Sequence, residues 1–144
     1  MKKLLFFGAF MFSLVSYSQI EFIETTKTEI VGKVEYVYLE KIGEEAYNLY
    51  YKNLNDPIHE YVHFSFKNLD NDIEKLYQII MRGFQESPRD PYKIKANGDV
   101  IWLKYTKEDG IVHLQIQQYV SRDPDIMTVS KLLTYDQVNR LFSK

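Results

Sequence analysis

The chain contains no cysteine, and this absence excludes several kinds of chemistry. No disulfide can stabilise the fold, and the chain has neither a thiolate nucleophile nor a cysteine-ligated zinc site. Glycine and proline are also few, six and four residues in 144, and no stretch rich in glycine, serine or proline divides the chain. The sequence therefore predicts one domain that depends on its hydrophobic core, for which twelve tyrosines and nine phenylalanines supply apolar area.

A run of basic residues is absent as well. The 18 Lys and Arg stand against 20 Asp and Glu, a formal net charge of −2 at pH 7. Removal of residues 1–18, which include Lys2 and Lys3, leaves 18 − 2 = 16 basic and 20 acidic residues, a net charge of −4. This balance argues against nucleic acid and anionic membrane surfaces as partners.

The first residues have the pattern of an export signal. Lys2 and Lys3 precede an apolar run over residues 4–15, and Ser16-Tyr17-Ser18 is a small-x-small cleavage site. The apolar run is short for a spanning helix, so the pattern predicts a signal peptide over residues 1–18 and a single mature domain over residues 19–144. Contact with the membrane is then limited to the transient signal peptide, the alternative being a retained anchor.

Residues 70–87 form the longest segment of the chain with helical periodicity. One apolar stripe comprises Ile73, Leu76, Tyr77, Ile80 and Phe84, which predicts a helix over about 71–86. Asn71 and Glu74 have the spacing of a capping box, and Ser87-Pro88 ends the helix.

Four strands are expected before this helix, over residues 20–25, 29–42, 45–53 and 60–67. Gly43-Glu44 suits a two-residue type II′ hairpin turn. That turn pairs Tyr38 with Leu49 and Tyr36 with Tyr51.

Strands over residues 91–96 and 126–133, and two hairpins between them, are expected after the helix. Asn97-Gly98 and Asp109-Gly110 are type I′ turn signals. Their registers agree, because they direct the same set of side chains to one face: Tyr92, Ile94, Ile101, Leu103, Tyr105, Val112, Leu114 and Ile116.

A second helix is expected over about residues 135–143, since Thr134 and Gln137 form a capping box. The fold class predicted is α+β, with about eight antiparallel strands in two meanders, each followed by a helix. One continuous sheet and two packed sheets remain alternatives.

The motif with the most specific chemistry is His59-Glu60-Tyr61-Val62-His63. On a helix, His59 and His63 could bind zinc and Glu60 could act as general base, with Glu86 as a distant third ligand. The motif resembles the signature of zinc metallopeptidases, and it makes a small zinc-dependent hydrolase the alternative function. However, Val62, Phe64 and Phe66 alternate as in a strand, where residues four apart are about 13 Å apart and cannot share one zinc.

The second candidate site is the face opposite the core in the later meander. Lys93 is expected across from Trp102, where the two can form a cation–π contact. His113, Gln117 and Tyr119 are expected on the same face. Such a face could bind a protein, peptide or glycan, and the alternative is an ordinary solvated sheet face.

Further features lie at the two ends of the chain. They are Lys2-Lys3 and the segment from Ser16 to Gln19 near the start, and Leu133-Thr134 with Leu141-Phe142 near the end. With these features the chain resembles a loose class of small uncharacterised secreted proteins from flavobacteria-like bacteria. The resemblance implies export and no particular activity. We therefore expect a non-enzymatic periplasmic or secreted binding domain without a cofactor, and the zinc hydrolase remains the alternative.

Overall fold

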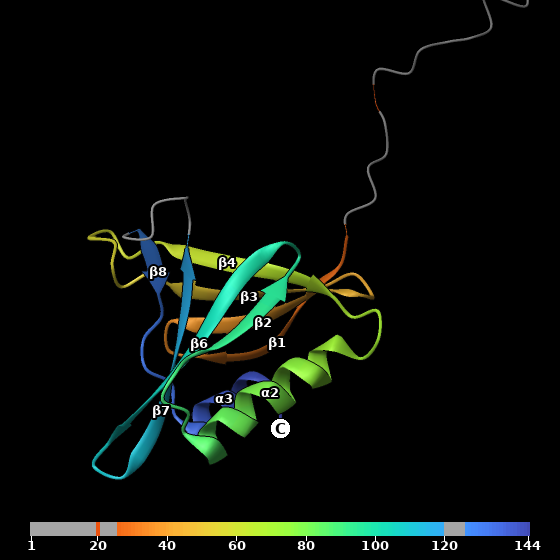
Figure 1. Ribbon diagram of the computed structural model, residues 1–144. Helices are drawn as coiled ribbons and strands as arrows, with labels where there is room; N and C mark the ends of the chain where they lie inside the picture. Colours follow the sequence, from red (N-terminus) through yellow and green to blue (C-terminus); the bar gives the residue numbers. More distant parts are fainter. Residues whose placement is uncertain (1–19, 21–25, 120–125) are drawn as a thin grey trace, which may run out of the picture.

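The described residues form two four-stranded antiparallel sheets and two helices (Figure 1). The computed structural model describes residues 20, 26–119 and 126–144. Sheet A contains β1 (Thr28–Val34), β2 (Val37–Ile42), β3 (Ala46–Lys52) and β4 (Tyr61–Lys67). Sheet B contains β5 (Tyr92–Ala96), β6 (Asp99–Glu108), β7 (Ile111–Tyr119) and β8 (Met127–Val129). Helix α2 (Asp72–Glu86) follows sheet A and α3 (Tyr135–Leu141) follows sheet B, which confirms the predicted α+β class.

The predicted signal peptide and its cleavage site lie outside the described residues, as do residues 21–25 of the expected first strand. Among the residues that the structure does describe, no helix is long and apolar enough to cross a membrane.

The prediction of one strand over residues 29–42 is wrong, because this segment folds back on itself as the β1–β2 hairpin. Val34 pairs with Val37, so the turn consists of Glu35 and Tyr36. Tyr36 has a φ of 65°, which is uncommon for a bulky residue. The turn contains no glycine, proline, asparagine or aspartate, so its sequence carries none of the usual turn signals.

The predicted register of the β2–β3 hairpin is wrong by one residue. Three residues rather than two connect Ile42 to Ala46, and Tyr38 therefore pairs with Tyr50 instead of Leu49. A shift of one residue moves every side chain to the other face of a sheet. The observed register buries Leu39 and Leu49 completely, and it places Tyr38 and Tyr50 on the outer face.

Both predicted hairpins of sheet B are confirmed. Each turn has two residues of positive φ, 49° and 85° at Asn97-Gly98 and 52° and 79° at Asp109-Gly110, as a type I′ turn requires. Lys93 pairs with Trp102, and Tyr105 pairs with Leu114, as expected.

The capping box predicted for one helix is present, and the one predicted for the other helix is absent. The box of Thr134 and Gln137 is present at α3, as predicted. The box at α2 is absent, because Asn71 adopts a left-handed conformation and its side chain caps nothing. Asn68 takes its place and accepts a hydrogen bond from the Ile73 amide at 3.1 Å.

One hydrophobic core includes residues of both sheets and both helices. The two helices lie side by side (Figure 1), where the Tyr77 hydroxyl donates to Asn139 Oδ1 at 2.5 Å. Between the sheets, the buried Tyr51 hydroxyl from β3 donates to Gln118 Oε1 of β7 at 2.7 Å. It also lies 2.6 Å from Thr128 Oγ1 of β8, so one side chain joins sheet A to two strands of sheet B.

Candidate functional site

The outer face of sheet B carries the side chains that point away from the core. Residues alternate between the two faces of a strand, so the buried Ile101, Leu103 and Tyr105 leave their neighbours on the outer side. We call this surface the sheet B face, and it comprises Lys93, Lys95, Trp102, Lys104, His113, Gln115, Gln117 and Tyr119.

Lys93, Trp102 and Tyr119 form a compact group on this face, the Trp102 cluster. The Lys93 Nζ atom lies 4.6 Å from the centroid of the Trp102 ring, which confirms the predicted cation–π contact. The rings of Trp102 and Tyr119 meet edge to face, with 5.2 Å between centroids. Tyr119 is 36% exposed and Trp102 is partly exposed, so neither ring is withdrawn into the core.

A line of amides runs beside the Trp102 cluster. Gln117 lies opposite Trp102 across the β6–β7 ladder and is only 6% exposed. Its Nε2 donates to Gln115 Oε1 at 2.9 Å, and Gln115 Nε2 donates to the Ser130 carbonyl at 3.1 Å. Gln117 is therefore positioned to support the Trp102 ring, and its own side chain presents little surface to a ligand.

His113 lies apart from the Trp102 cluster. It pairs with Thr106, four residues along β6 from Trp102, which is a separation of about 13 Å. The buried His113 Nδ1 and Thr106 Oγ1 atoms have no hydrogen-bond partner among the described residues. The structure thus brings together four of the five predicted binding residues and leaves His113 at the other end of the face.

The residues of the zinc motif do not lie on a helix. His63 is part of strand β4, and His59 belongs to the preceding loop with a φ of 53°. The Glu86 carboxylate, at the end of α2, accepts a hydrogen bond from the Tyr92 hydroxyl. In the described part of the chain, no three His, Cys, Asp or Glu side chains are grouped as metal ligands. The alternating Val62, Phe64 and Phe66 explain this, because a strand buries them against the core.

A row of aromatic side chains on the outer face of sheet A was not predicted. Tyr38 and Tyr50 stack with their centroids 4.6 Å apart, and the His63 ring lies 4.9 Å from Tyr50. Burial, with Tyr50, Glu40 and Tyr61 nearby, raises the pKa of the Tyr38 phenol. The predicted register hid this row, because it placed Tyr38 opposite Leu49. Tyr36, Tyr38 and Glu40 alternate with the buried Val37 and Leu39. This alternation places them on the opposite face and could have predicted the row.

Lys52 extends the row to the β1–β2 turn. Its Nζ atom lies 4.3 Å from the centroid of the Tyr36 ring and 5.7 Å from that of Tyr61. These contacts occupy the lysine within the protein, whereas Lys95 and Lys104 on the sheet B face have no ion-pair partner among the described residues. The sheet B face is therefore the better candidate for an external ligand.

Comparison of the chain with models of protein families, with curated proteins and with solved structures gave no match.

Proposed function

We propose that the protein is a non-enzymatic exported domain, periplasmic or secreted, which binds a protein, peptide or glycan through the sheet B face. The observation that carries this proposal is the Trp102 cluster. A tryptophan on a solvent-facing sheet, held on one side by Lys93 and on another by Tyr119, is preorganised to stack on a ligand. The signal-peptide pattern of residues 1–18 supports the exported location.

The charge of the sheet B face favours an anionic glycan among these ligands. Lys93, Lys95 and Lys104 are exposed on this side of sheet B, and Glu108, the acidic residue that the alternation of β6 places on the same side, lies six residues from Trp102 at the end of the strand. Ammonium groups attract carboxylate or sulfate groups, while the indole of Trp102 can cover the apolar face of a sugar ring. The whole chain is acidic, so this positive surface is a local property of sheet B.

Calorimetric titration of the mature protein with an oligouronate, beside a neutral oligohexose of the same length, tests the proposal. The oligouronate is expected to bind more tightly, and binding is expected to weaken as salt is added. Trp102→Ala is expected to weaken binding at least tenfold, since truncation of a central tryptophan costs about 2 kcal/mol or more.

Tyr135→Ala is the matched control, because Tyr135 is an exposed aromatic residue of α3 outside the sheet B face. Its affinity for the oligouronate should equal that of the wild type. Equal affinity in Trp102→Ala, with an unchanged circular dichroism spectrum, would refute the proposed site. Binding of an acidic peptide in place of the oligouronate, with the same loss in Trp102→Ala, would retain the site and change the ligand class.

A further inference from the structure

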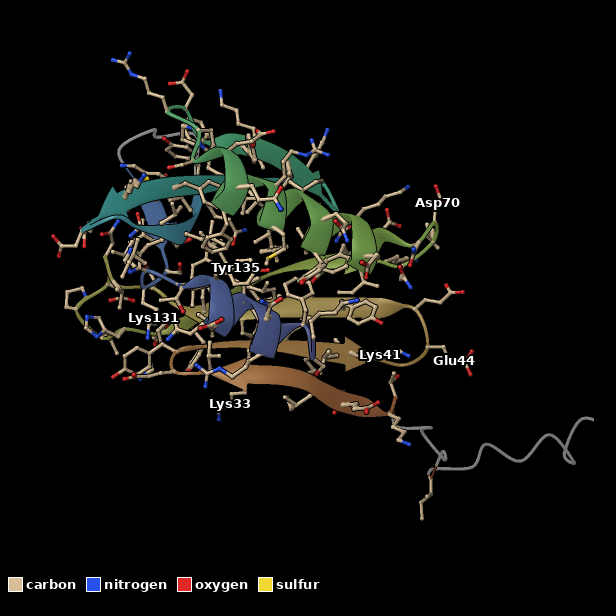
Figure 2. All side chains as sticks on the ribbon, turned by 90° about the horizontal axis from the view of Figure 1, so that it is seen from below. Lys33, Lys41, Glu44, Asp70, Lys131 and Tyr135 are labelled. Atoms are coloured by element: carbon tan, nitrogen blue, oxygen red, sulfur yellow. The ribbon has the colours of Figure 1, made fainter. Side chains whose placement is uncertain are left out.

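An apolar groove lies between the two sheets, and Lys95 is the residue that it shares with the sheet B face. Its walls are the edge strand β4 of sheet A, the edge strand β5 of sheet B and the first half of α2. It has a volume of about 430 Å³, within the range of roughly 300–1,000 Å³ that is typical of small-molecule sites. We call it the β4–β5 groove. In Figure 2, Asp70 marks the loop between β4 and α2, at the end of the molecule where Lys41 and Glu44 also lie.

The walls of the groove are mostly apolar. Phe64 and Leu76 contribute from the core, and Phe66, Ile79 and Ile94 are partly buried residues that pack against it. Leu69 lies at the groove with 73% of its surface exposed, although it is a large apolar residue. A concave apolar surface of this kind gains free energy when an apolar ligand displaces water from it.

Lysines provide the charge at the groove. Lys67, Lys75 and Lys95 line it, together with Asp72. Lys75 is engaged elsewhere, since its Nζ atom lies 2.8 Å from Asp70 Oδ2. Asp72 Oδ2 accepts hydrogen bonds from the amides of Leu69 and Asp70 and so stabilises the loop.

Lys67 and Lys95 are therefore the two charged side chains of the groove that remain available to a ligand. Both are exposed, and neither forms an ion pair with another described residue. They come from the edge strands β4 and β5, so each sheet contributes one lysine to the lining of the groove.

We propose that the β4–β5 groove binds a single-chain amphiphile with a carboxylate head, the chemical class of a long-chain fatty acid. The alkyl chain packs on Phe64, Leu76 and Ile79, and the carboxylate is held at the rim by Lys67 and Lys95.

Titration of the mature protein with dodecanoate below its micellar concentration, followed by calorimetry, tests the assignment. Dodecanoate is expected to bind saturably at one site per chain. Its methyl ester, which lacks the charge, is expected to bind about tenfold more weakly. The Lys67→Gln, Lys95→Gln double variant should lose about the same factor for dodecanoate and nothing for the ester.

Ile79→Gln tests the apolar wall, and it is expected to weaken binding of both dodecanoate and the ester at least tenfold. Ile111→Gln is its matched control, because Ile111 is an exposed isoleucine that lines a different cavity beside Tyr135. Absence of saturable binding would overturn the proposal. Loss of binding in Ile111→Gln but not in Ile79→Gln would also overturn it, since the ligand would then occupy the other cavity. Trp102→Ala is expected to leave dodecanoate binding unchanged, which separates this site from the sheet B face.

Discussion

Replacing Gly83 by alanine should destabilise the protein, although helix propensity alone predicts the opposite. Gly83 lies within α2, where alanine is favoured over glycine by about 1 kcal/mol. However, a Cβ atom at this position would overlap the ring and the hydroxyl of Tyr105 on β6. Tyr105 is only 5% exposed, its hydroxyl donates to the Ile80 carbonyl at 2.6 Å, and its ring meets Phe84 edge to face. The ring therefore has little space into which it can move.

The sizes of the opposing free-energy terms determine whether Gly83→Ala stabilises or destabilises the protein. Overpacking of a filled core costs about 1–3 kcal/mol, and loss of the hydrogen bond from a buried hydroxyl costs about 1–3 kcal/mol more. After subtraction of the propensity gain, Gly83→Ala is expected to lower the free energy of unfolding by about 1–5 kcal/mol. Urea denaturation followed by circular dichroism measures this change.

Two further variants isolate the cause. Gln85→Ala changes an exposed residue of the same helix and should alter the free energy of unfolding by no more than about 0.5 kcal/mol. In a Tyr105→Leu background the overlapping atoms are absent, so adding Gly83→Ala should stabilise the protein by up to about 1 kcal/mol. A stabilising effect of Gly83→Ala in the wild-type background would refute the close packing of α2 on β6.

Further predictions concern the sheet contact, a helix cap, pH and zinc. Tyr51→Phe removes the hydroxyl that joins the sheets and takes a hydrogen-bond partner from Gln118 and from the buried Thr128, so urea denaturation should show a loss of about 1–3 kcal/mol. Thr134→Ala should cost about 1 kcal/mol through loss of the α3 capping box, and Thr134→Ser should restore most of it. Burial raises the pKa of Tyr51 and of Tyr105 above the unfolded value of about 10. The two phenols therefore contribute to stability below a pH of about 10, and this contribution is lost as the pH rises toward the folded pKa. Because Tyr51→Phe has one such phenol fewer, its urea midpoint should fall less than that of the wild type as the pH is raised above about 10. Elemental analysis after addition of zinc should find no stoichiometric metal in the wild type or in the His59→Ala, His63→Ala variant, because these histidines do not share a helix face. One zinc per chain, lost in that variant, would contradict the strand geometry.

The features that the sequence predicted correctly depend on neighbouring residues. Asn97-Gly98 and Asp109-Gly110 tolerate positive φ at both positions of a turn, and each turn sets the register of its own hairpin. The same registers predicted the Lys93–Trp102 contact on the sheet B face. The Thr134 cap likewise depends only on Gln137, three residues later.

The features that were missed depend on residues far apart in the chain. The turn at Tyr36 has no local turn signal, and Lys52 of β3 supplies a contact to its ring. The register beyond Gly43 follows from burial of Leu39 and Leu49 in a core that sheet B and the helices complete, which no local pattern reports.

The candidate sites divide in the same way. The alternation of residues along β6 and β7 was sufficient to place Trp102 and Tyr119 on one face. The β4–β5 groove exists only because β4, β5 and α2 come together, and its two uncommitted lysines are 28 residues apart in the chain (Lys67 and Lys95). Local hydrogen bonding and side-chain alternation are properties of the sequence by itself, whereas the space between two sheets is decided only when the core closes.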